Sequence, residues 1–180
     1  MNIYVDDETD PLEDGTLEHP FDTIQEGMAI ADITGDRVIL LDGVYTGSGN
    51  VFNRFYGREI TIESLNGPDN CIIDCEFADR AFLFADGESA GAGILGLTIK
   101  NGYDSITGVV YCASDSAPLI QGNRFENNRN GAIYCSNASP QILQNEFIDN
   151  EMNHGEKILK AYFSLPITER FEIARKLSLL

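Results

Sequence analysis

An internal repeat of short, strand-like segments runs through the second half of the chain. Residues 108–114, GVVYCAS, recur 23 residues later as 131–137, GAIYCSN, and residues 118–128, PLIQGNRFENN, recur 22 residues later as 140–150, PQILQNEFIDN. A unit this short cannot enclose a hydrophobic core, so the copies have to stack with each strand beside its equivalent. The repeat predicts an all-β fold, a parallel β-helix (solenoid) of about five coils between residues 37 and 150.

The same alignment places like side chains above one another. Phe125 aligns with Phe147 and Ile99 falls one coil earlier, so all three are expected to stack in the interior. Asn123 aligns with Asn145, which predicts a ladder of side-chain hydrogen bonds. Bends between strands need residues that tolerate positive φ, as Asn and Gly do. The positions expected at these bends are Gly102, Asn127 or Asn128, and Asn150.

The repeat divides the chain into three parts. Residues 1–36 are expected to form an N-terminal cap that combines a strand with an amphipathic helix, because the open end of such a stack needs covering. The apolar face of that helix comprises Phe21, Ile24 and Met28. Residues 37–150 hold the coils, and residues 151–180 have the pattern of a tail of two short α-helices.

Each predicted helix of the tail carries an apolar stripe, and the two helices are separated near Pro166. Two interpretations stay open for this tail. It can plug the C-terminal end of the β-helix, or it can dock on a partner protein. The residues expected to contact such a partner are Leu159, Tyr162, Phe163, Ile167, Phe171, Ala174 and Leu177.

The first 45 residues add a family resemblance. The motifs that carry it are, in order, Ile3-Tyr-Val-Asp, Asp14-Gly-Thr, His19-Pro-Phe-Asp-Thr-Ile-Gln-Glu, Gly35-Asp-Arg-Val-Ile-Leu and Gly43-Val-Tyr. This order resembles the opening of right-handed parallel β-helix proteins of the pectin-lyase-like superfamily. The resemblance implies a right-handed coil, but it implies no single activity, because the superfamily includes lyases, hydrolases, epimerases, adhesins and noncatalytic repeats.

The catalytic motifs of that superfamily are missing from the chain. It contains no Asn-Thr-Asp, Gly-His-Gly or Arg-Ile-Lys, and its two histidines, His19 and His154, lie outside the coils. A polysaccharide lyase-like activity is the form that catalysis would take here, using clustered carboxylates, Ca²⁺ and a basic residue. The absent motifs favour a noncatalytic protein.

The best candidate for such a site is a run of charged residues in the second predicted coil. Asp74, Glu76 and Arg80 are the candidate catalytic residues, with Asp74 and Glu76 on one face of a strand. Two or three neighbouring carboxylates can hold Ca²⁺; the candidate ligands are Asp69, Asp74, Glu76 and Asp79. Otherwise no cofactor is expected. The simpler interpretation is a set of outward-facing, solvated charges. The acidic segment 6–15 can also attract a cation, but it lacks EF-hand spacing.

Two further pairs align between the last coils. Tyr111 aligns with Tyr134, and these side chains can form an aromatic ladder for carbohydrate or can stack in the core. Tyr56 and Tyr103 are further candidates for an exposed aromatic surface. Cys112 aligns with Cys135, which leaves a disulfide, a thiol pair or two small buried side chains as interpretations. The last is favoured, because free cysteine behaves as a buried apolar residue.

The charge of the chain restricts its partners. The net charge is −17, and residues 1–36 hold eleven acidic residues and no Lys or Arg. This field disfavours direct contact with nucleic acid or an anionic membrane, and no apolar run is long enough to span a bilayer. The first residues carry no signal-peptide pattern, so a cytoplasmic location is expected; a secreted protein without its signal would have the same sequence.

Three functions follow from these features, in order of preference. The first is a noncatalytic intracellular interaction module that docks on a partner protein through its tail. The second is a carbohydrate-binding or carbohydrate-processing β-helix, which makes a glycan a possible ligand. The third is an acidic mimic of DNA, although the acidity is concentrated in the cap instead of following the coils.

Overall fold

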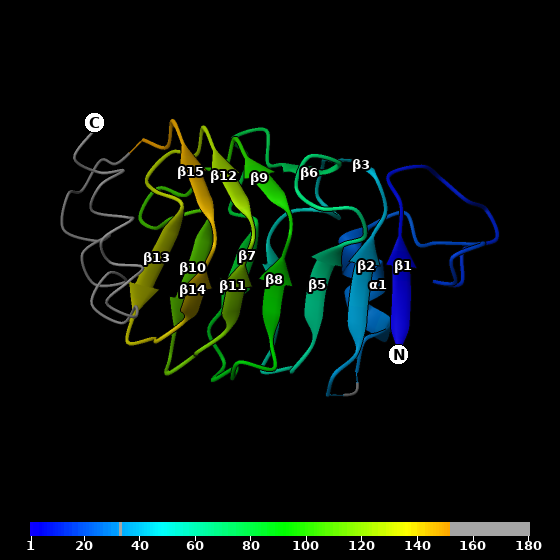
Figure 1. Cartoon of the computed structure of the whole chain (residues 1–180), viewed down its shortest axis with the longest axis horizontal. Helices are drawn as coiled ribbons and strands as arrows, with labels where there is room; N and C mark the ends of the chain where they lie inside the picture. Colours follow the sequence, from blue (N-terminus) through cyan, green and yellow to red (C-terminus); the bar gives the residue numbers. More distant parts are fainter. Residues whose placement is uncertain (33, 152–180) are drawn as a thin grey trace.

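The computed structural model describes residues 1–32 and 34–151, which form a parallel β-helix with one short α-helix (Figure 1). Sheet A contains β1 (Asn2–Val5), β2 (Arg37–Leu40), β5 (Thr61–Ser64), β8 (Gly93–Leu95), β11 (Leu119–Gln121) and β14 (Gln141–Leu143). Sheet B contains β3 (Gly43–Tyr45), β6 (Cys71–Asp74), β9 (Thr98–Lys100), β12 (Arg124–Glu126) and β15 (Glu146–Ile148). Sheet C contains β4 (Asn53–Arg54), β7 (Phe82–Phe84), β10 (Val110–Ala113) and β13 (Ile133–Ser136).

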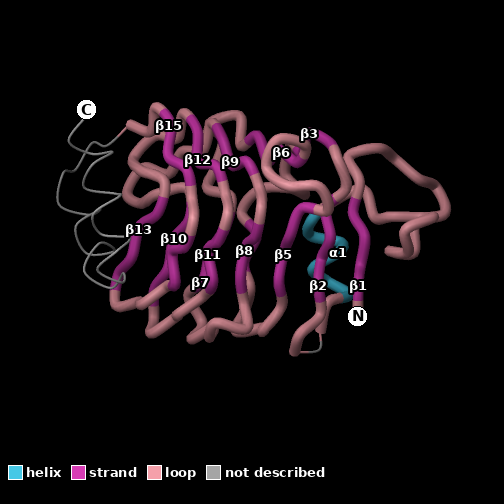
Figure 2. The backbone as a smooth tube through the Cα atoms, viewed as in Figure 1, coloured by secondary structure: helices cyan, strands magenta, loops and turns pink. Residues whose placement is uncertain are grey.

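The chain visits sheets A, B and C in turn and then starts the next coil. Four complete coils run from β2 to β13, and β14 with β15 begins another (Figure 2). Along sheet A, Arg37 pairs with Thr61, Thr61 with Gly93, Gly93 with Leu119 and Leu119 with Gln141, so successive coils take 24, 32, 26 and 22 residues. The 32-residue coil lies outside the expected spacing, because it makes longer connections at 65–70 and 85–92.

Alternation along each strand sends one set of side chains into the core. In sheet B, Phe125 pairs with Ile99 on one side and with Phe147 on the other. The rings of Phe125 and Phe147 are stacked with centroids 5.3 Å apart, and Phe125 is fully buried. The expected stack and the parallel register are therefore confirmed, although Phe147 is 37% exposed and only Ile99 and Phe125 are fully buried.

Asparagine side chains join neighbouring coils at the bends. The expected ladder forms, because Asn123 Nδ2 donates to Asn145 Oδ1 at 3.1 Å. Positive φ is found at Asn127, as expected, but at Asn101 and Asp149 instead of the residues that follow them.

Asn128 and Asn150, which follow two of these positive-φ residues, bind backbone groups of neighbouring coils. The Asn128 side chain accepts from the Gly102 N–H at 2.7 Å and donates to the Ile99 carbonyl at 3.0 Å. Asn150 is placed in the same way one coil later, where it accepts from Asn128 N–H and donates to the Phe125 carbonyl. These amides satisfy backbone groups that the bends would otherwise leave unpaired.

The N-terminal end of the stack is closed by strand β1, by helix α1 (Ile24–Ile30) and by the loop between them. Thr23 caps the helix by accepting from the Glu26 N–H, and Ile24 and Met28 are buried as expected. Phe21 lies before the helix and forms a β-bridge with Val5 instead of lying on the helical face. Because β1 pairs with β2, the cap extends sheet A directly.

The acidic segment 6–15 lies in the loop that protrudes beyond β1 (Figure 1). Its carboxylates hold the loop together: Asp10 accepts from the Leu12 N–H and contacts His19 Nδ1 at 2.8 Å, and Asp14 accepts from the Thr16 N–H. The predicted C-terminal tail and its seven apolar residues lie outside the described residues. Within the described chain, no helix is long and apolar enough to cross a membrane.

Candidate functional site

The four carboxylates proposed as calcium ligands do not converge. Asp69 pairs with Arg124 at 2.7 Å, whereas Asp74 accepts from Asn101 Nδ2 at 2.8 Å and lies 3.4 Å from Lys100 Nζ. Glu76 is exposed, and its backbone N–H donates to Asp74. No group of three or more metal-ligating side chains is found among residues 1–32 and 34–151.

Cross-coil pairing is the physical reason for this separation. Asp74 is aligned with Lys100 by the pairing of β6 with β9, so the opposite charges sit one above the other on the outer face of sheet B. Burial raises the pKa of Asp74, but hydrogen bonds from Asn101 and Glu76 and the charge of Lys100 outweigh it, and the net pKa is lowered. The proposed ligand and catalytic carboxylate is therefore an ion-pair partner between coils.

Arg80, the third candidate catalytic residue, pairs with Asp104 and not with Asp74. It lies in the connection between β6 and β7, and its side chain is only 13% exposed. The guanidinium lies 5.9 Å from the Phe52 ring centroid and 5.3 Å from the Tyr111 ring centroid. Both distances are within reach of a cation–π interaction, so two rings from different coils hold the cation between them.

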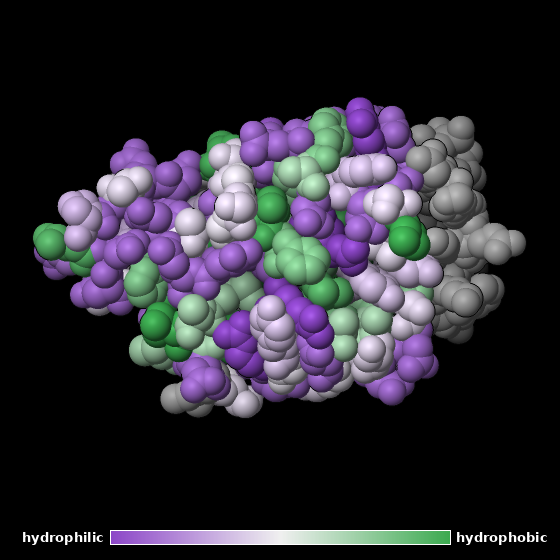
Figure 3. Space-filling model, turned by 180° about the vertical axis from the view of Figure 1, so that it is seen from behind, coloured by the Kyte–Doolittle hydropathy of each residue, from purple (hydrophilic) through white to green (hydrophobic). Residues whose placement is uncertain are grey.

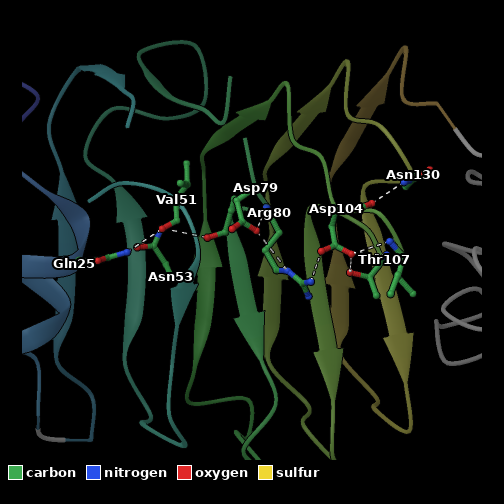
Figure 4. Close-up of polar contacts among 10 residues, drawn as sticks. Gln25, Val51, Asn53, Asp79, Arg80, Asp104, Thr107 and Asn130 are labelled. Carbon is green, nitrogen blue, oxygen red and sulfur yellow. Dashed lines mark hydrogen bonds and ion pairs between the residues drawn. The ribbon is translucent and has the colours of Figure 1, made fainter. Parts of the chain in front are cut away.

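Asp104 fixes the far end of Arg80. Arg80 Nη2 donates to Asp104 Oδ2 at 2.5 Å, and the other oxygen accepts from the Ile106 N–H, the Thr107 N–H and the Thr107 hydroxyl (Figure 4). Burial raises the pKa of Asp104, but these hydrogen bonds and the charge of Arg80 lower it overall. Asn130, one coil further on, donates to the Asp104 carbonyl at 2.6 Å.

A second ion pair lies on the same sheet. Arg54 in β4 donates to both oxygens of Asp86, from Nε to Oδ2 at 2.9 Å and from Nη2 to Oδ1 at 2.7 Å. Its guanidinium carbon lies 4.9 Å from the Tyr56 ring centroid. The hydrogen bond from Arg54 lowers the pKa of Asp86 more than burial raises it. This bidentate geometry fixes both side chains beside an exposed ring.

The outer side of sheet C and its leading turns therefore form one surface, which we call the aromatic face. Tyr111 and Tyr134 stack with ring centroids 5.4 Å apart, as the repeat predicted, and both are half-buried on the outside of β10 and β13. Phe52 is 44% exposed, Tyr56 66% and Ile106 69%. The aromatic face comprises Phe52, Arg54, Tyr56, Arg80, Asp86, Asp104, Ile106, Tyr111 and Tyr134.

Hydrophobic residues gather around the middle of the molecule in Figure 3, whereas the protruding N-terminal end is mostly hydrophilic. Tyr103, the remaining tyrosine candidate, is 39% exposed beside Asp104 and forms a β-bridge with Arg129. Arg129 in turn stacks on Phe77 at 4.1 Å, which extends the line of rings and cations along the turns.

Sequence reasoning found the tyrosines and Arg80 but missed Phe52, Arg54 and Asp104. Asp104 has no equivalent in the repeat, so alignment could not place it opposite Arg80. Arg54 and Tyr56 did carry a signal, because they alternate with Asn53 and Phe55, which are both fully buried.

The two Asp–Arg pairs of the aromatic face hold the carboxylates ionised, because the pKa of each is lowered, and a general acid needs a raised pKa. Rings flanked by fixed polar groups suit a ligand that has both apolar patches and hydroxyl groups.

One comparison with known proteins identifies the fold family. Residues 29–163 match the model of the family described as right-handed β-helix region. The chain belongs to this right-handed β-helix family. The match, together with about four turns of parallel solenoid, is consistent with the pectin-lyase-like superfamily that the first 45 residues resemble. No match is found among the curated proteins or the solved structures.

Proposed function

We propose that this right-handed β-helix is a noncatalytic binding module whose aromatic face binds a neutral glycan. The observation that carries the proposal is the stack of Tyr111 on Tyr134 in neighbouring coils, with Arg80 held between the rings of Tyr111 and Phe52. Sugar rings pack their apolar faces on aromatic side chains, and their hydroxyl groups bind carboxylates and guanidinium groups.

The charge of the protein supports a neutral ligand. The chain carries a net charge of −17, so an acidic polysaccharide would be repelled. Arg54 and Arg80, the cations of the face, are already neutralised by Asp86 and Asp104. A neutral ligand can use the oxygens and N–H groups of these pairs without separating the charges.

Binding to an array of neutral and acidic glycans, followed by calorimetric titration of any ligand found, tests this proposal. Tyr111→Ala should weaken binding at least about tenfold, or about 1.4 kcal/mol, because it removes the ring that stacks on Tyr134 and contacts Arg80. Tyr4→Ala is the matched control, since Tyr4 is a half-buried tyrosine on the outer face of sheet A. Equal losses in both variants, or no binding to any neutral glycan, would reject the proposal.

A protein partner is the second candidate function, and Ile106 is the observation that favours it. Ile106 is 69% exposed and follows closely on Asp104, the ion-pair partner of Arg80, and such an isoleucine resembles the apolar anchors of protein interfaces more than a sugar subsite. Docking through the C-terminal tail remains a prediction of the same kind. A pull-down that compares Ile106→Asp with deletion of residues 156–180 separates the two surfaces, because each change removes only one of them.

A further inference from the structure

Two free cysteines lie side by side on neighbouring coils. Cys112 in β10 is the register partner of Cys135 in β13, and both side chains point into the core, where they are 0% and 7% exposed. The two thiols are close enough for each to shift the pKa of the other. Neighbouring parallel strands lie about 4.8 Å apart, within the Cα separation of about 4.4–6.8 Å that a disulfide bridges.

The other two cysteines provide an internal comparison. Cys71 and Cys75 are also free and buried, but they lie four residues apart along one extended segment. Their Cα atoms are then about 13 Å apart, well beyond the limit of about 7 Å for a disulfide. Burial raises the pKa of both thiols to about 12, so neither is easily ionised.

The pair at 112 and 135 has unequal reactivity. Burial raises the pKa of Cys112, whereas the hydrogen bond from Cys112 lowers the pKa of Cys135. Cys135 is also the more exposed of the two, at 7% against 0%, so a small oxidant reaches its sulfur first. It lies in the last complete coil, and local opening at the end of a repeat stack breaks fewer neighbouring contacts than opening in its middle.

We propose that Cys112 and Cys135 are a redox-sensitive pair that forms a disulfide between the third and fourth coils. A small disulfide such as oxidised glutathione serves as the oxidant. The Cys135 thiolate attacks it and releases one glutathione thiolate, which leaves a mixed disulfide. The Cys112 thiolate then attacks the Cys135 sulfur and releases the second glutathione. The two protein thiols lose two electrons and two protons, and the oxidant is reduced to two glutathione thiols.

The bond would tie the end of the stack to its body. It closes a loop that contains the whole connection from β10 to β13, including β11 and β12, and it restricts the unfolded chain accordingly. It also lies directly beside Tyr111 and Tyr134 in the sequence, so it would fix the spacing of those two rings. The inference stands on the cysteines alone and does not depend on what the aromatic face binds.

Incubation of the full chain with oxidised glutathione, followed by thiol counting and mapping of non-reduced peptides, tests the proposal. The count of four thiols should fall to two, and one linked peptide should join Cys112 to Cys135. Cys71→Ser should leave that link unchanged, and Cys112→Ser should stop at a glutathione adduct on Cys135. The midpoint of thermal unfolding should rise on oxidation of the unaltered chain and fall back on reduction.

Three results would overturn the proposal: retention of all four thiols, a link that involves Cys71 or Cys75, or a stable glutathione adduct on Cys135 in the unaltered chain. The thiol count in denaturant, where all four cysteines react, shows that the reagent is active. Cys135→Ser also separates chemistry from folding, because its unfolding midpoint should not change when oxidised glutathione is added.

Discussion

Replacing Phe125 with alanine should destabilise the β-helix by about 3–5 kcal/mol, the usual cost of truncating a buried phenylalanine to alanine. The side chain is 0% exposed and stacks on Phe147, so truncation leaves a cavity in the interior column of sheet B. Phe147 is 37% exposed, and about two thirds of the same cost, or about 2–3 kcal/mol, is expected for Phe147→Ala.

Urea unfolding followed by far-ultraviolet circular dichroism measures both free energies, and comparison of the slopes checks that the unfolded states match. The double variant should show a coupling of about 0.5–1.5 kcal/mol, the contribution of one stacked aromatic pair. Phe125→Leu is the control for volume and should cost less than about 1.5 kcal/mol. A loss for Phe125→Ala no larger than that for Phe147→Ala, or zero coupling, would refute the stacked interior.

Three further predictions follow from single contacts. Gly102→Ala should destabilise the fold by at least about 1–3 kcal/mol in the same urea assay, since the new Cβ would lie 2.1 Å from Val109 Cγ2. Glu88→Gln should lower the free energy of unfolding by about 1–3 kcal/mol. The buried carboxylate accepts the Gly57 N–H on one oxygen and the Asp86 N–H on the other, whereas an amide has only one oxygen that can accept. Asp104→Asn should flatten the acid limb of the stability profile. Because the pKa of Asp104 is lower in the folded state than its ordinary value of 3.8, the ionised carboxylate stabilises the fold at pH values above 3.8, and this stability is lost as the pH falls through the folded-state pKa. An acid limb that is the same in the variant and in the unaltered protein would contradict the assignment.

The sequence was most informative where the coils repeat regularly. The steps of 22 and 23 residues paired Phe125 with Phe147 and Tyr111 with Tyr134 correctly, because a parallel register forces equivalent residues together. The spacing gave less guidance in the earlier coils. The longer turns of the 32-residue coil shift its strands out of the regular spacing, so the register could not be read from the repeat. The two-residue strand β4 has no copy in the sequence.

Polar pairing across the coils could not be deduced in the same way. Arg80 and Asp104 meet because the connections that precede β7 and β10 lie side by side, although neither residue belongs to a repeated motif. The grouping of Asp74 with Asp69 and Asp79 followed from closeness in sequence, whereas in the structure Asp74 pairs with Lys100 and Asp69 with Arg124, both on later coils. The bends expected at Gly102 and Asn150 were misjudged by one residue, because these two residues bind neighbouring coils, Gly102 through its backbone N–H and Asn150 through its side chain.

The central claim is that stacking of the coils creates a single recognition face on sheet C. Titration of a neutral oligosaccharide into protein carrying ¹³C-labelled tyrosine and phenylalanine rings, observed by NMR, tests it most directly. The account predicts shifts for the rings of Phe52, Tyr111 and Tyr134 and none for Tyr4 on the opposite sheet. Shifts confined to Tyr4, or no change in any of the four rings at saturating sugar, would contradict it.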